Sequence, residues 1–185
     1  MRQILIGLVV LCLSGCASIH YDKTKTGELK GKTIIEWIEP DKFIFRPDKD
    51  NPLTFTRHNK DKITPGLMYT DGGSIPRPLW AIRSYSPWGY AQAFIVHDWL
   101  FNMKHCQLPG YERYTVKEAA WVMSEIMKTM MEKYGVDKLT LYTMFEAVRS
   151  PIAESLWNTG KCEQPSIQLF EFKSKIKMQY VIEFP

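Results

Sequence analysis

The spacing of apolar residues along this chain changes twice, and these changes constrain its fold more than any other feature. Residues 33–56 contain short apolar segments between polar turns, which is typical of strands. Residues 88–150 repeat apolar side chains at intervals of three and four, as helices do, and residues 176–184 alternate with period two. We therefore expect an α+β domain, in which a small antiparallel sheet packs against about three α-helices.

The predicted sheet takes strands from both ends of the chain. The first third contributes four short segments, at residues 33–37, 42–45, 53–56 and 63–69. A Glu39-Pro40-Asp41 turn separates the first two of them. In the tail, residues 176–184 have one apolar face, and residues 167–172 are a candidate partner across a turn at 173–175. We expect this hairpin to join or extend the first sheet.

The three helices are predicted from capping signals and apolar spacing. The first begins at Ser86-Pro87-Trp88, because proline is favoured in the first turn of a helix. The second starts at a capping box, Thr115 with Glu118, and ends at Gly135. Asp137 caps the third, which a proline at position 151 should kink or end.

At the start of the chain, a positive charge, an apolar run and a cysteine follow one another as they do in an export signal. Arg2 precedes an apolar run over residues 4–13, which is shorter than the roughly 20 residues needed to span a bilayer. The run ends in Leu13-Ser14-Gly15-Cys16, which resembles the lipobox of bacterial lipoproteins. In that class the signal is cut before the cysteine, which then carries acyl chains such as palmitate. The alternative is an ordinary signal peptide with a chance cysteine.

These features divide the chain into three parts. Residues 1–15 are predicted to be a lipoprotein signal peptide, residues 16–32 a lipid anchor and polar tether, and residues 33–185 a single α+β domain. By resemblance to lipoprotein sorting, Ala17 after the cysteine implies the periplasmic face of the outer membrane. The expected partners are the membrane, through the lipid, and another envelope protein. A formal net charge of +4, with lysines scattered among acidic residues, excludes a nucleic-acid-binding stripe.

The four cysteines have different predicted roles. Cys12 leaves with the signal, and Cys16 is the lipidation site. Cys106 and Cys162 remain as an even pair in an oxidising compartment, so we expect them to form a disulfide. A metal site built on these two cysteines lacks further ligands at zinc spacing.

The candidate chemistry lies in residues 70–101. Asp71 precedes two glycines in a loop that leaves backbone carbonyls free, and His97 and Asp98 follow on an apolar helix. Such a loop beside a His-Asp pair could hold a hard cation and a general base together. The alternative is that Asp71 caps a turn, while His97 and Asp98 are core polar groups with satisfied hydrogen bonds. The residues by themselves leave both interpretations open.

This motif resembles a family of phage and bacterial proteins of unknown function. Members typically show Asp-Gly-Ala-Ser-Ile-Pro-Arg and then His-Asp-Trp-Leu-Tyr. Here residues 71–77 read Asp-Gly-Gly-Ser-Ile-Pro-Arg, and residues 97–101 read His-Asp-Trp-Leu-Phe. The resemblance runs from about Ile63 to Trp157 and includes Ala147-Val148-Arg149. It implies a fold and no settled activity.

A more distant similarity is to the secreted prokaryotic and fungal phospholipases A(2). There a helical histidine is the general base for a water molecule, and the next aspartate helps to bind calcium. By this resemblance His97 would be the base, and Asp71, Asp98 and the Gly73 backbone would bind calcium. The metal would then stabilise an ester oxyanion.

One position departs from both families. They usually have Ala-Asp near the start of the second helix, and in the phospholipases an aspartate on this helix orients the histidine, whereas this chain has Ala119-Ala120. Glu118 projects to another side of the helix. Loss of the comparable aspartate in serine proteases lowers the rate by about four orders of magnitude.

We therefore expect a non-catalytic, lipid-anchored envelope lipoprotein that interacts with another envelope component or excludes competing phage. The alternative is a calcium-dependent lipid esterase with a weakened His97 site, and calcium is a cofactor only under that alternative. The chain has no Gly-x-Ser-x-Gly, no His-Glu-x-x-His and no phosphate-binding glycine loop.

Overall fold

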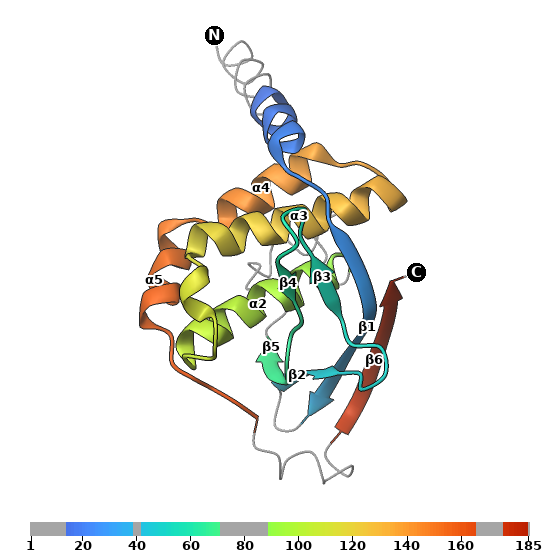
Figure 1. Cartoon of the computed structure of the whole chain (residues 1–185), viewed down its shortest axis with the longest axis vertical. Helices are drawn as coiled ribbons and strands as arrows, with labels where there is room; N and C mark the ends of the chain where they lie inside the picture. Colours follow the sequence, from blue (N-terminus) through green and yellow to red (C-terminus); the bar gives the residue numbers. More distant parts are fainter. Residues whose placement is uncertain (1–13, 39–41, 71–88, 166–175, 185) are drawn as a thin grey trace.

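One curled antiparallel sheet and a layer of helices build the protein, as its computed structural model shows (Figure 1). The structure describes residues 14–38, 42–70, 89–165 and 176–184. Its elements are β1 (Glu28–Ile38), β2 (Lys42–Pro47), β3 (Thr54–Thr56), β4 (Lys62–Ile63), β5 (Met68–Thr70), α2 (Ala91–His105), α3 (Val116–Tyr134), α4 (Lys138–Val148), α5 (Pro151–Thr159) and β6 (Ile176–Phe184). The α+β class is confirmed, and α5 and a helix over residues 14–23 add to the three helices expected.

β1 organises the sheet because it pairs along both edges. Its residues 33–38 lie between β2 and β6, and its first residues pair with β3. β4 then follows β3, and β5 follows β2. At Gly31, between these two stretches of β1, φ is +97° and an added Cβ would overlap the Pro52 carbonyl. Only glycine fits this backbone, because it lacks a Cβ and tolerates positive φ.

The C-terminal strand completes the sheet from the far end of the sequence. β6 is antiparallel to β1, with Ile182 opposite Thr33 and Tyr180 opposite Ile35. The prediction that the tail joins the first sheet is confirmed. The expected partner at residues 167–172 and the expected turns at 39–41 and 173–175 lie outside the described residues.

α2 and α3 pack on the sheet and form most of the core with it. α2 contacts both α3 and β5, and every side chain from Ala91 to His97 is buried. A helix that is buried nearly all round needs apolar residues on more than one face, which α2 has. The large fully buried side chains come from both layers, including Phe45, Phe55, Phe94, Met123 and Met127.

The predicted helix caps are present. The Thr115 hydroxyl accepts a hydrogen bond from the Glu118 amide at 3.2 Å, and the Asp137 carboxylate accepts one from the Thr140 amide at 3.0 Å. α4 ends before Pro151, which opens α5. Because proline lacks an amide hydrogen, it suits a first turn and interrupts a continuing helix. The expected start of the first helix at residues 86–88 lies outside the described part of the chain, and α2 begins at Ala91.

The expectation of a polar tether over residues 16–32 is wrong. Residues 14–23 are helical, β1 begins at Glu28, and both pack on the rest of the domain. Ala17, His20 and Thr24 are only 2%, 6% and 1% exposed. The inward residues recur at helical spacing, but most are small or polar, so the composition looks like a linker. None of the helices in the described ranges is long and apolar enough to cross a membrane.

A disulfide joins Cys106, just after α2, to Cys162, just after α5, with an S–S distance of 2.04 Å. It bridges the pair of cysteines that signal cleavage and lipidation would leave, across a sequence separation of 56 residues. Cys16 is the free cysteine of the described residues, and it is exposed. The crosslink therefore holds the C-terminal end of the helix that contains His97.

Candidate functional site

His97 and Asp98 lie in the middle of α2, where the helix passes between β5 and α3. His97 is only 6% exposed and its neighbours Val96 and Leu100 are fully buried, whereas the Asp98 side chain is 15% exposed. The two adjacent residues therefore face different surroundings. The histidine points into the core and the aspartate lies at its edge.

The His97 imidazole is buried, and the described part of the chain offers it no hydrogen bond. Among the described residues, neither Nδ1 nor Nε2 has a hydrogen-bond partner. The Asp98 Oδ1 atom lies 3.7 Å from Nδ1, which is too far for a hydrogen bond. The ring instead packs against Phe101, at 4.9 Å between centroids. A buried polar group without a partner costs about 1–3 kcal/mol, so such a group in a core needs an explanation other than stability.

Asp98 connects α2 to the end of β5. Its Oδ2 atom accepts a hydrogen bond from the Thr70 hydroxyl at 2.7 Å. Thr70 is the last residue of β5 and directly precedes Asp71 in the sequence. The fold therefore brings the helical carboxylate close to the start of the predicted Asp-Gly-Gly loop. Asp71 and Gly73 themselves lie outside the described residues, so their part in the site stays a prediction.

Within the described structure, α3 supplies no carboxylate that contacts His97. Ala120, at the position that departs from both families, is fully buried on α3, which packs on α2. Glu118 and Glu125 both accept hydrogen bonds from the Arg57 guanidinium, at 3.1 Å and 2.8 Å. The Glu125 hydrogen bond is the main cause of the raised pKa of Arg57. These two acidic side chains are thus paired with a cation that directly follows β3.

The described residues contain no group of three or more histidine, cysteine, aspartate or glutamate side chains that could hold a metal ion. The calcium site expected from the phospholipase resemblance needs Asp71 and the Gly73 backbone. Both are outside the described ranges, so calcium binding also stays a prediction.

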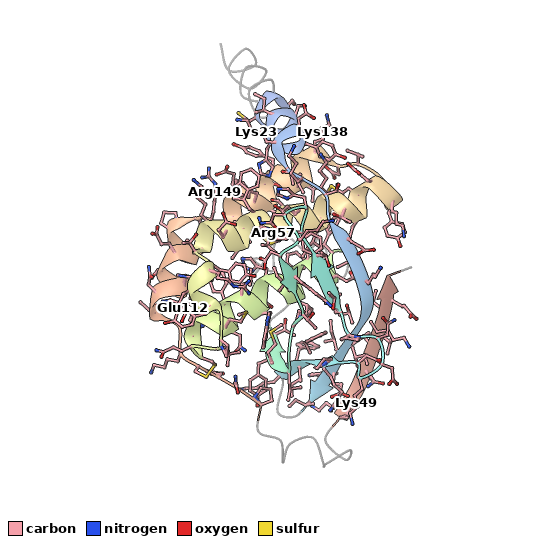
Figure 2. All side chains as sticks on the ribbon, in the orientation of Figure 1. Lys23, Lys49, Arg57, Glu112, Lys138 and Arg149 are labelled. Carbon is pink, nitrogen blue, oxygen red and sulfur yellow. A yellow bond between two sulfur atoms is a disulfide. The ribbon has the colours of Figure 1, made fainter. Side chains whose placement is uncertain are left out.

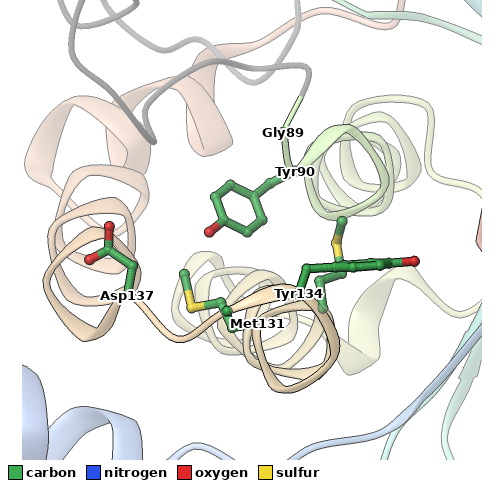
Figure 3. A pocket seen from close by; sticks show the side chains of 7 residues that line it. Gly89, Tyr90, Met131, Tyr134 and Asp137 are labelled. Atoms are coloured by element: carbon green, nitrogen blue, oxygen red, sulfur yellow. The ribbon is translucent and has the colours of Figure 1, made fainter.

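A pocket of about 370 Å³ lies away from the His-Asp pair, where the start of α2 meets the turn between α3 and α4 (Figure 3). It is lined by Gly89, Tyr90, Met130, Met131, Tyr134, Gly135 and Asp137. Burial, and then the charge of Asp137, raise the pKa of Tyr90. Asp137 also caps α4 through Thr140, so its carboxylate has a structural role.

The structure contains a second buried histidine, which belongs to no sequence motif. His20, in the N-terminal helix (residues 14–23), packs against Phe145 and Trp121 at 4.2 Å and 5.0 Å between ring centroids. Its Nε2 atom lies 3.3 Å from the Ser124 hydroxyl. One signal was available, since Ala17, His20 and Thr24 share one face of a helix. The partners on α3 and α4 come from more than one hundred residues away, with a separation of 104 for Ser124.

Cys16 lies at the outer end of the same helix. Its side chain is exposed and lies near enough to Tyr142 of α4 to contribute to the raised pKa of that phenol. Burial and Glu146, more than Cys16, raise the pKa of the Tyr142 phenol. The structure therefore places the predicted lipidation site on the surface, beside α4.

Comparison with known proteins finds a family model that matches the chain. The family model for DUF1353, described as a protein of unknown function, matches residues 50–148. This range contains β3 to β5 and helices α2 to α4, including Thr70, His97, Asp98 and Ala120. Neither the curated proteins nor the solved structures contain a match to the chain. The matched range covers more than half of the chain, which therefore belongs to the DUF1353 family of proteins of unknown function.

Proposed function

We propose that this protein is a non-catalytic lipoprotein, anchored by lipid at Cys16 to the periplasmic face of the outer membrane. The observation that carries the proposal is the position of Cys16. It follows an export-like sequence, it is exposed, and the residue after it is buried against the domain. An acyl chain on this thiol would therefore extend outward without disturbing the core.

Acyl labelling of cells that produce the full chain tests the anchor. Cys16→Ser should abolish incorporation of a palmitate analogue and leave an uncleaved precursor or a soluble protein. Ser18→Ala, two residues away on the same helix, is the matched control and should keep the label. Unchanged labelling of Cys16→Ser would overturn the proposal.

The absence of catalysis is supported by the surroundings of His97. A general base must receive a proton in a defined tautomer, and an acceptor on its second nitrogen normally fixes that tautomer. At the position where the phospholipases have this acceptor, the chain has Ala120, and the nearby Glu118 and Glu125 are paired with Arg57. We therefore expect no measurable phospholipase turnover by the purified protein, with calcium or with a chelator.

The second candidate is a calcium-dependent lipid esterase. The observation that favours it is the placement of Asp98 beside Thr70, which directly precedes Asp71 in the sequence, together with the His97 nitrogens, which have no hydrogen-bond partner among the described residues. Calcium-dependent hydrolysis that disappears in His97→Ala would establish this candidate in place of the first. His105→Ala, in the last turn of α2, is a matched control that should not affect turnover.

A role in excluding competing phage is the finer part of the proposal, and the resemblance to phage and bacterial proteins supports it. Cells that produce the protein should then reduce the plating efficiency of susceptible phages, and Cys16→Ser should restore it. Equal plating across a broad phage panel, with normal acylation, would remove the exclusion role and leave an interaction with another envelope protein.

A further inference from the structure

We propose that the anchor segment, residues 16–24, fixes the orientation of the domain on the membrane, so that the α3–α4 end lies against the lipid surface. The inference rests on the proposed lipidation of Cys16 and goes beyond it. A lipid anchor alone sets only a distance from the membrane, whereas a rigid attachment also selects the face that contacts it.

The middle of the anchor segment is held by packing. The His20 ring lies among Trp121, Tyr142 and Phe145, with centroids 5.0, 5.8 and 4.2 Å away. Ala17, one turn earlier, is only 2% exposed. These contacts join the segment to both α3 and α4, so the segment cannot swing about a single helix.

The end of the anchor segment is held by hydrogen bonds. Lys128 of α3 donates from Nζ to the backbone oxygens of Tyr21 and Thr24, at 2.9 Å and 3.0 Å. A cation is favoured there because the last carbonyls of a helix lack partners. The ammonium of Lys128 also lies 4.3 Å from the centroid of the Tyr21 ring, and that of Lys138 lies 5.1 Å from it. Just beyond, the Gly27 amide donates to Thr129 at 3.0 Å.

These contacts leave almost no tether between lipid and domain. A flexible chain over residues 16–32 would span roughly 20–25 Å. Here Cys16 would be the first residue after signal cleavage, and Ala17 is already buried. The acyl chains would therefore begin one residue away from the folded surface, and the domain must lie at the bilayer.

The surface around this attachment point suits a lipid interface. Exposed apolar side chains occur on the anchor segment and at the α3–α4 turn, with Ile19 56%, Val136 55% and Leu139 48% exposed. Figure 2 shows Lys23 and Lys138 at the end of the molecule from which the N-terminal helix projects, and Lys49 at the opposite end. Apolar side chains flanked by lysines are typical of proteins that lie on lipid headgroups. The occupant is the bilayer itself, because the acyl chains of Cys16 enter it here.

Depth-dependent quenching of a fluorophore tests the orientation. The acylated mature protein is reconstituted in vesicles that contain brominated lipid, with a bimane label at one introduced cysteine. We expect the label in Leu139→Cys or Val136→Cys to be quenched at least about threefold more than the label in Val181→Cys. Val181 is the matched control, because it is 56% exposed and lies on β6, away from the anchor segment.

A second variant separates attachment from orientation. His20→Ala should keep the acyl label but reduce the difference in quenching between positions 139 and 181, while circular dichroism confirms that the domain is folded. Equal quenching at both positions in the acylated parent protein would overturn the inference and leave the proposed lipid anchor intact. Absence of the acyl label would overturn the proposed function and this inference with it.

Discussion

His20 and His97 are both buried, each 6% exposed, yet their surroundings differ. His97 belongs to the motif that dominates the sequence, and neither of its ring nitrogens has a hydrogen-bond partner among the described residues. His20 belongs to no motif, but it contacts the Ser124 hydroxyl and three aromatic rings. The motif therefore contains a buried histidine without a hydrogen bond in the described structure, whereas the histidine outside the motif has both polar and aromatic contacts.

The helices that contain the two histidines are also attached to the domain in different ways. α2, which contains His97, is tied near its end by the Cys106–Cys162 disulfide. The N-terminal helix has no such crosslink in the described structure and depends on side-chain contacts with α3 and α4. We therefore expect the two regions to respond differently to reduction, substitution and acid.

Loss of the disulfide should have the largest effect. Replacing both Cys106 and Cys162 with serine should lower the free energy of unfolding by about 4 kcal/mol, because the crosslink restricts the unfolded chain over a long loop. Urea denaturation of the variant and the parent protein measures this loss. Hydrogen exchange in the variant should rise first at the end of α2 and in α5, and later in residues 17–24. An unchanged urea midpoint would contradict the prediction.

The next largest effect is expected at Ala120. Ala120→Asp places a carboxylate in a fully buried position, and we expect a loss of more than about 3 kcal/mol if no partner is reached. Ala120→Asn is the matched neutral control. If aspartate destabilises less than asparagine, it has paired with His97, and calcium-dependent hydrolysis should then be measured in that variant and in its His97→Ala derivative.

The same substitution at both histidines should have opposite effects. His20→Leu should destabilise by about 1–2 kcal/mol, since it removes a hydrogen bond and aromatic contacts. His97→Leu should be neutral or stabilise by up to about 1 kcal/mol, because it removes buried polar atoms for which the described residues supply no partner. Thermal denaturation of the two variants and the parent protein shows whether each substitution raises or lowers stability. Strong destabilisation by His97→Leu would show that the imidazole has a structural partner.

The smallest of these effects is expected from acid on the His20 side. Burial is the main cause of the pKa of His20 lying below its usual 6.5, while Glu146 opposes this shift. The unfolded chain therefore takes up the proton at a higher pH than the folded protein does. The contribution of His20 to stability should be complete well above pH 6.5 and should fall as the pH drops through that value. The melting temperature of the parent protein should fall by a few degrees more than that of His20→Leu between pH 7 and 5.

The sequence by itself determined the fold class and most of the helix boundaries. Period-two and helical spacing gave the α+β class, and the caps at Thr115 and Asp137 and the break before Pro151 lie where short-range chemistry predicts them. These features depend on residues within four positions of each other. For that reason no knowledge of the tertiary structure was needed to find them.

Only the tertiary structure decided what surrounds each histidine. The tether prediction failed because the residues that contact His20 and Thr24 on α3 and α4 lie more than one hundred positions away. The sequence also gave no sign that Arg57 would pair with Glu118 and Glu125. Burial and pairing depend on which distant segments meet in space, and a local pattern of residue types does not contain that information.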